Sequence, residues 1–152
     1  MFEFSTITPE IFTEEKHQQD VESVADFLFE HLDQYGDKRE DIMKCIRYAL
    51  NPEPGFGGFV LSARDKGNGE IVGAVIINKT GMNGYIPDNL LVYIAVHGGY
   101  RGKGLGKSLM KEAIDNCKGD IALHVEPDNP ARYLYEKLGF TNKYLEMRYH
   151  RK

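Results

Sequence analysis

A basic, glycine-rich stretch, YRGKGLGKSL at residues 100–109, is the part of this chain whose residue types and spacing best suit chemistry. Between residues 101 and 108 it holds three glycines and three basic residues. Glycine lets the backbone approach a ligand closely and adopt positive φ angles, and amides at a helix N-terminus attract anions. The stretch therefore predicts a turn that binds phosphate. The alternative is an ordinary strand-to-helix turn with a solvated basic rim.

Residue spacing disfavours two common nucleotide-binding patterns for this turn. The triphosphate loop GxxxxGK[ST] needs four residues between its glycines, whereas GKGLGKS has three between Gly102 and Gly106. The dinucleotide pattern GxGxxG requires glycine at 107 or a small residue at 109, where Lys107 and Leu109 stand. A nucleotide-dependent phosphotransferase is therefore disfavoured.

A strand and a helix are expected to hold this turn. LLVYIAV at residues 90–96 is a continuous apolar run, which indicates a strand buried on both faces. After the turn, apolar residues recur at helical spacing from Leu105 to Cys117, with Gly119 as the expected C-terminal cap. The pattern then predicts a strand at 121–126, a short helix within 128–140 capped by Asp128 or Asn129, and a closing strand at 143–150.

The first half of the chain predicts helices followed by a hairpin. Apolar residues recur at helical spacing up to about Leu32, and again from Ile42 to Leu50. Runs rich in β-formers at 57–65 and 70–78 are joined by KGNG, a hairpin signature. This order of elements predicts a single α/β (α+β) domain over residues 1–152, with a mixed sheet and right-handed crossovers in its second half.

Composition and charge argue against several classes of protein. The 152 residues carry a net charge of −4, which argues against general nucleic-acid binding. The longest apolar run, Leu90–Val96, is too short to span a membrane, and the N-terminus lacks the basic start of a signal peptide, so a cytoplasmic protein is expected. Cys45 and Cys117 match no metal-ligand spacing, so reduced structural thiols and no metal are expected.

Two motifs in the second half of the chain occur in the order and spacing of a known family. The glycine turn fits R-x-x-G-x-G at Arg101, Gly104 and Gly106, and NPARYLYEKLGF follows at residues 129–140. Together they span Leu90 to Phe140, about a third of the chain. In these motifs the sequence resembles the GCN5-related N-acetyltransferase (GNAT) superfamily. The resemblance implies a central mixed, mostly antiparallel twisted sheet flanked by helices, with parallel strands that splay at the cofactor site.

The resemblance also implies acetyl-CoA as the co-substrate. In the family, the glycine turn holds the pyrophosphate of acetyl-CoA, and the strand before it leaves N–H groups free for the pantetheine arm. The residues assigned in this way to acetyl-CoA are Ile94, Ala95, Val96, Arg101, Gly102, Lys103, Gly104, Leu105, Gly106, Lys107, Ser108, Asn129 and Tyr135.

Catalytic roles follow from the same resemblance. Tyr135 matches the family tyrosine that protonates the departing thiolate, although its spacing also suits a core residue. Asn129 matches a position that hydrogen-bonds the cofactor arm and also suits a helix cap. His124 takes the strand position where some relatives carry a glutamate base, with Glu126 as second choice; the alternatives are ordered water and a solvent-facing histidine. Ala122, His124 and Glu126 are expected to share one strand face.

These assignments predict a transferase that moves an acetyl group from acetyl-CoA to a primary amine of a small molecule, peptide or protein, by direct attack in a ternary complex. A non-catalytic acyl-CoA-binding module of the same fold is the alternative. Tyr85, Asn89, Tyr93 and Tyr149 are candidates to line the amine site. No nucleic-acid or membrane partner is expected, and a homodimer is left open.

Overall fold

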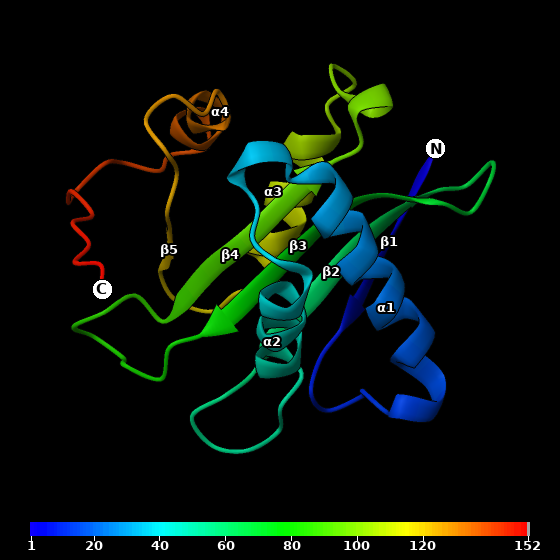
Figure 1. Ribbon diagram of the computed structural model, residues 1–152, viewed down its shortest axis with the longest axis horizontal. Coiled ribbons are helices and arrows are strands. Elements are labelled where there is room, and N and C mark those ends of the chain that lie inside the picture. Colours follow the sequence, from blue (N-terminus) through cyan, green and yellow to red (C-terminus); the bar gives the residue numbers. More distant parts are fainter. Residues whose placement is uncertain (152) are drawn as a thin grey trace.

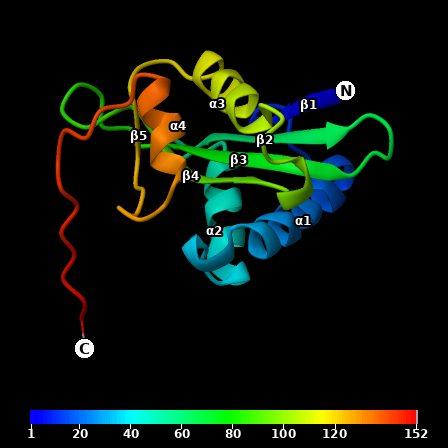
Figure 2. The same cartoon turned by 90° about the horizontal axis from the view of Figure 1, so that it is seen from above.

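The computed structural model describes residues 1–151 and shows a five-stranded sheet between two layers of helices (Figures 1 and 2). The strands are β1 (Phe2–Ile7), β2 (Gly58–Asp65), β3 (Ile71–Lys79), β4 (Asn89–Val96) and β5 (Ile121–Leu123). They lie in chain order, antiparallel from β1 to β4, whereas β5 is parallel to β4. The predicted mixed, mostly antiparallel sheet and its hairpin are therefore confirmed.

Each face of the sheet is covered by a pair of helices. α1 (Glu14–His31) and α2 (Arg39–Ala49) pack on one face, and α3 (Leu105–Asp115) and α4 (Ala131–Lys137) pack on the other (Figure 2). Leu28 and Ile46 are fully buried in the first core, and Leu61 and Leu109 in the second. Within residues 1–151, no helix combines the length and apolar character needed to cross a bilayer.

Besides β5, which is shorter than the predicted strand at 121–126, three elements differ from the sequence-based expectation. β1 is absent from the expected elements, although its alternating exposure is typical of an edge strand. α3 ends at Asp115 with Asn116 as its cap, so the prediction that Gly119 caps this helix is wrong. The predicted closing strand at 143–150 is also wrong for the single chain, because these residues are exposed and form no element.

Gly58, at the start of β2, offers a test of the sheet packing. Its φ is +139°, and a Cβ at this position would lie 1.8 Å from the carbonyl oxygen of Ile77 in β3. Because that oxygen belongs to the backbone of a paired strand, Gly58→Ala should lower the free energy of unfolding by about 2–4 kcal/mol.

Gly55→Ala is the matched control for this prediction. Gly55 also has a positive φ, +90°, but nothing lies within 4 Å of a Cβ there. This substitution should therefore cost only the backbone strain, about 1–2 kcal/mol. Urea unfolding of both variants measures the difference. Equal losses would contradict the clash at Gly58.

Candidate active site

The candidate site begins where β4 and β5 separate. The two strands pair only from Asn89 with Ile121 to Leu91 with Leu123. β5 ends there, whereas β4 continues to Val96 with β3 as its only neighbouring strand in the described residues. The second half of β4 therefore presents an open backbone edge, which matches the splayed parallel strands that the resemblance implies.

The hydrogen-bond alternation of β4 decides which amides face this opening. The amide of His97 donates a hydrogen bond to the carbonyl oxygen of Val72, 2.8 Å away. From Val96 back to Tyr93, the antiparallel pairing of β4 with β3 then continues without a break. Bonded and non-bonded pairs alternate along such a ladder. Tyr93 and Ala95 therefore bond β3, while the N–H groups of Ile94 and Val96 point into the opening. By this alternation, the amide of Ala95 does not belong to the open edge.

A β-bulge sets the side-chain directions at this point. Leu91 pairs with Ile77 and Tyr93 pairs with Ile76, so Val92 is an extra, unpaired residue. Leu91 accordingly packs in the core beneath α3, whereas Tyr93 packs on the α1 and α2 side.

Tyr93 is fixed by a contact that has no signal in the sequence. Its hydroxyl donates to Asp37, 2.5 Å away, in the segment before α2. Burial, and then this carboxylate, raise the pKa of Tyr93 well above its ordinary value. The contact holds the segment between α1 and α2 against β4, close to the opening. Tyr93 therefore positions this wall of the site with a neutral hydroxyl.

The glycine turn places the N-terminus of α3 at the end of β4. Gly102 and Gly104 have φ values of +80° and +79°, in the region that favours glycine. The first four amides of an α-helix have no acceptor within the helix; here the amide of Ser108 is the one that first donates back, to the carbonyl of Gly104. The amides before Ser108 are therefore oriented to bind an anion.

Gly106 brings the turn, the strand and α4 together. A Cβ at this position would lie 3.4 Å from Leu134 of α4 and 3.8 Å from Val96 of β4. These are ordinary van der Waals distances, so the first turn of α3 lies within one side chain's reach of both elements. The predicted phosphate turn and the signature helix α4 therefore lie side by side.

Basic side chains line the exposed rim of the turn. The side chain of Arg101 is 58% exposed, and its guanidinium lies 3.5 Å from the carboxylate of Asp33. An ion pair this exposed is weak, so the guanidinium is available to an incoming phosphate. Lys103 lies over the ring of Tyr100, 5.3 Å from its centre. The ring nitrogen Nδ1 of His97 accepts a hydrogen bond from the amide of Gly99, a contact that shapes the turn and was not predicted.

Tyr135 combines a buried ring with a hydroxyl that has no partner in the described chain. The residue is 7% exposed, and its ring lies 6.0 Å from that of Phe140. The hydroxyl makes no hydrogen bond with any of residues 1–151, and the hydroxyl oxygen is not among the fully buried atoms. Burial raises the pKa of Tyr135 to about 12. The group therefore stays protonated at neutral pH and is free to donate to a ligand.

Asn129 lies one residue before Pro130, the N-cap of α4, so the predicted cap at Asp128 or Asn129 is wrong by one residue. The side-chain oxygen of Asn129 accepts a hydrogen bond from the amide of Ala131, 2.9 Å away. The side-chain nitrogen remains available as a donor. The hydrogen bond at the start of α4 and a ligand contact are therefore compatible at this position.

The candidate bases His124 and Glu126 are placed differently from the expectation. β5 ends at Leu123, so the prediction that both lie on one strand face with Ala122 is wrong. Both side chains are exposed in the segment between β5 and α4. The strand is short because β4 diverges from it after Leu91, and a strand without a partner has no ladder to continue.

Two of the candidate amine-site residues do not lie at the opening beside β4. Asn89 is buried, and its amide group donates to the backbone oxygens of Lys118 and Asp120. Tyr149 is 80% exposed in the C-terminal segment. Asn89 therefore fastens β4 to the segment before β5 instead of facing the opening.

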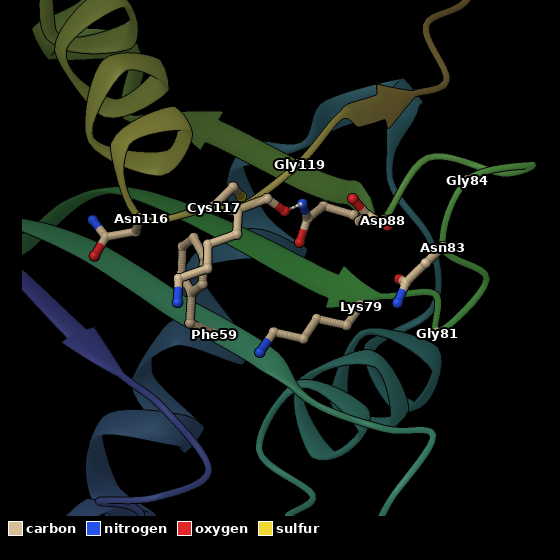
Figure 3. Close-up of a pocket in the computed structure, with 11 residues that line it drawn as sticks. Phe59, Lys79, Gly81, Asn83, Gly84, Asp88, Asn116, Cys117 and Gly119 are labelled. Carbon is tan, nitrogen blue, oxygen red and sulfur yellow. Dashed lines mark hydrogen bonds between the residues drawn. The ribbon is translucent and has the colours of Figure 1, made fainter.

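A separate pocket lies at the opposite end of β4 from the glycine turn. It has a volume of about 630 Å³ and is lined by Phe59, Lys79, Asp88, Cys117 and Lys118, among others (Figure 3). It adjoins Asn89 at the start of β4 and follows the end of α3, roughly 20 Å along the strand from Val96. Burial raises the pKa of the Cys117 thiol to about 11, so this cysteine is a poor nucleophile.

Comparisons with known proteins agree with this geometry. The model of the Acetyltransferase (GNAT) family matches residues 13–140. N-alpha-acetyltransferase RimI of Mycobacterium tuberculosis is 38% identical over 60 residues, which are 38% of each chain. The Cysteine-rich protein 2-binding protein of Mus musculus is 38% identical over 55 residues, 35% of this chain and 7% of that protein. The chain thus matches well under half the length of these curated relatives.

Solved structures share the fold over the full length. Ribosomal-protein-alanine N-acetyltransferase from Brucella melitensis has a TM-score of 0.64 at 17% identity, with 99% of both chains covered. An acetyltransferase of Trypanosoma brucei has a TM-score of 0.60 at 21% identity, also with 99% of both chains covered. At these identities the likeness concerns the fold. The family model covers most of the sequence, from residue 13 to residue 140, and this range includes the glycine turn, the opening beside β4 and α4. The chain therefore belongs to the Acetyltransferase (GNAT) family.

Proposed function

We propose that this protein transfers an acetyl group from acetyl-CoA to a primary amine, by direct attack of the amine in a ternary complex. The observation that carries the proposal is the open edge of β4, which leads straight into the glycine turn. An extended amide-bearing arm fits a free strand edge, and a pyrophosphate fits the amides at the start of α3. Acetyl-CoA carries an amide-bearing arm that is followed by a pyrophosphate, which is the order in which the β4 edge and the glycine turn follow one another.

The chemistry requires few groups, and this chain supplies candidates for each. The amine forms a C–N bond with the thioester carbon, and the C–S bond then breaks. The N–H groups of Ile94 and Val96 orient the arm in the opening, and the hydroxyl of Tyr135 gives its proton to the departing sulfur. The proton lost by the amine leaves through His124, Glu126 or water, and Tyr135 regains its proton from solvent.

A free peptide N-terminus is the first acceptor to test. RimI and the Brucella enzyme bear names that describe acetylation of an α-amine and of an alanine on a ribosomal protein. The glycine turn and α4 lie inside the matched region of the family model. A small-molecule amine is the second acceptor class, and a non-catalytic acyl-CoA sensor is the alternative function.

Amine-dependent release of CoA tests the proposal. The panel contains a peptide with a free alanine N-terminus, the same peptide with a blocked N-terminus, and small diamines. We expect release with at least one free amine and none with the blocked peptide. Binding of acetyl-CoA without turnover on any amine would instead support the sensor.

Calorimetry separates CoA binding from nucleotide binding. Acetyl-CoA should bind in the micromolar range, about −7 to −9 kcal/mol. ATP with magnesium is the control and should bind far more weakly, because the turn lacks the spacing of a triphosphate loop. Tighter binding of ATP would overturn the assignment of the turn.

A further inference from the structure

The pocket at the start of β4 takes no part in the proposed acetyl transfer, yet it has the size of a ligand site. Its volume of about 630 Å³ falls within the range of roughly 300–1,000 Å³ that small-molecule sites occupy. The buried ring of Phe59 and the half-buried side chain of Cys117 give it apolar surface (Figure 3). The pocket is therefore large enough for a small molecule and the water around its charged groups.

Hydrogen bonds fix the segments that form this pocket. The hydroxyl of Tyr48 donates to the carbonyl oxygen of Lys79, 2.7 Å away, at the end of β3. In the loop between β3 and β4, the hydroxyl of Thr80 donates to the carbonyl oxygen of Pro87, also 2.7 Å away. Asn89 joins the start of β4 to the segment that follows α3. A site that is formed in this way before its ligand arrives loses less conformational entropy on binding.

Charged groups of both signs line the pocket without pairing with one another. Lys79, Lys118 and Asp88 form no ion pair within residues 1–151. Burial raises the pKa of the Cys117 thiol, and the ammonium of Lys79 partly offsets this rise because it lies near the sulfur. Two cations and one anion are therefore available to a ligand.

Asp88 is held at the wall of the pocket by the space that Gly119 leaves. A Cβ on Gly119 would lie 1.8 Å from the carboxylate oxygen Oδ2 of Asp88. Figure 3 shows Asp88 beside Gly119, whereas the side chain of Lys79 extends away from both, toward Phe59. The pocket thus presents its negative and positive groups at different sides, with apolar surface at the positive side.

We propose that this pocket binds a free α-amino acid with an apolar side chain. The α-carboxylate pairs with the ammonium groups of Lys79 and Lys118, and the α-ammonium pairs with Asp88. The apolar side chain packs against Phe59 and Cys117. A simple anion would be repelled by the carboxylate of Asp88, and a simple cation by the two lysines. A zwitterion with an apolar body satisfies all of these groups at once.

Calorimetry without acetyl-CoA tests this site, since no acetyl transfer then contributes. The probes are L-leucine, L-methionine and L-phenylalanine, and at least one should bind with a dissociation constant below about 1 mM. The amide of that amino acid lacks the carboxylate, and its N-acetyl derivative lacks the ammonium. Each derivative should bind at least about tenfold more weakly, because a charged group of the pocket then stays unpaired. No binding of any probe at about 10 mM, or equal affinity for the amino acid and both derivatives, would overturn the proposal.

Substitutions locate the bound amino acid. Lys79→Gln and Asp88→Asn should each weaken its binding by at least about tenfold, because each removes one charged partner. The matched control is Lys111→Gln, which removes the same charge from an exposed position of α3 outside the pocket and should change the affinity by less than about twofold. Calorimetry with acetyl-CoA should give the wild-type affinity for all three variants, since the glycine turn is unchanged. An amino acid that binds all three variants as well as the wild type occupies another surface, and this result would refute the assignment.

Discussion

Tyr135→Phe should lower turnover by about 10²–10⁴ while leaving the affinity for acetyl-CoA nearly unchanged. The substitution removes one oxygen and keeps the ring that packs beside Phe140. Because the hydroxyl makes no hydrogen bond within the described chain, its loss leaves no partner unsatisfied. The free energy of unfolding should therefore change by less than about 1 kcal/mol. Steady-state kinetics on the best amine, together with calorimetry, separates the two effects.

Tyr133→Phe is the matched control on the same helix. Tyr133 is 63% exposed, so loss of its hydroxyl should change neither turnover nor stability. If Tyr135→Phe is as active as the wild type, Tyr135 has no part in the reaction, and the acyl-CoA sensor becomes the better proposal. A loss shared by both variants would point to a general effect on α4.

The pH dependence of the wild type follows from the burial of Tyr135. Burial raises the pKa of this hydroxyl to about 12, above the ordinary value of 10.0. The acid therefore remains protonated through the alkaline range, and turnover should show no falling limb below about pH 10. The same shift stabilises the fold fully below pH 10, and this contribution is lost as pH rises toward 12. Unfolding measured across that range should show the loss in the wild type but a smaller one in Tyr135→Phe.

Gly104→Val should weaken acetyl-CoA binding by about 100-fold or more. Gly104 has a φ of +79° and directly precedes α3. A β-branched side chain resists this φ, so the turn should rearrange and its amides should no longer converge on one phosphate. Loss of two hydrogen bonds to a charged group accounts for an effect of this size. Calorimetry with acetyl-CoA measures it.

Gly98→Val is the control for the turn. Nothing lies within 4 Å of a Cβ at Gly98, and its φ is not in the positive region. The same side chain should therefore be accepted there, with affinity within about threefold of the wild type, or roughly 0.7 kcal/mol. If Gly104→Val also binds within that limit, the turn does not hold the pyrophosphate.

The sequence by itself determined the glycine turn and the elements on either side of it. The strand Asn89–Val96, the turn and α3 are contiguous in the chain, so their order is fixed by covalent connection and by local preferences. Gly102 and Gly104 report backbone geometry directly, because both have a positive φ, a region that glycine favours. The hydrogen bond from the amide of Ala131 to Asn129, at the start of α4, is local in the same way.

Only the tertiary structure decided which groups face the opening. The extra residue Val92 and the early end of β5 depend on pairing between strands, and they select the N–H groups of Ile94 and Val96. The contact between Tyr93 and Asp37 joins residues 56 positions apart. The same divergence of strands leaves His124 and Glu126 exposed outside β5. Periodicity describes one segment at a time, whereas these features arise from the register of segments that meet only in the folded chain.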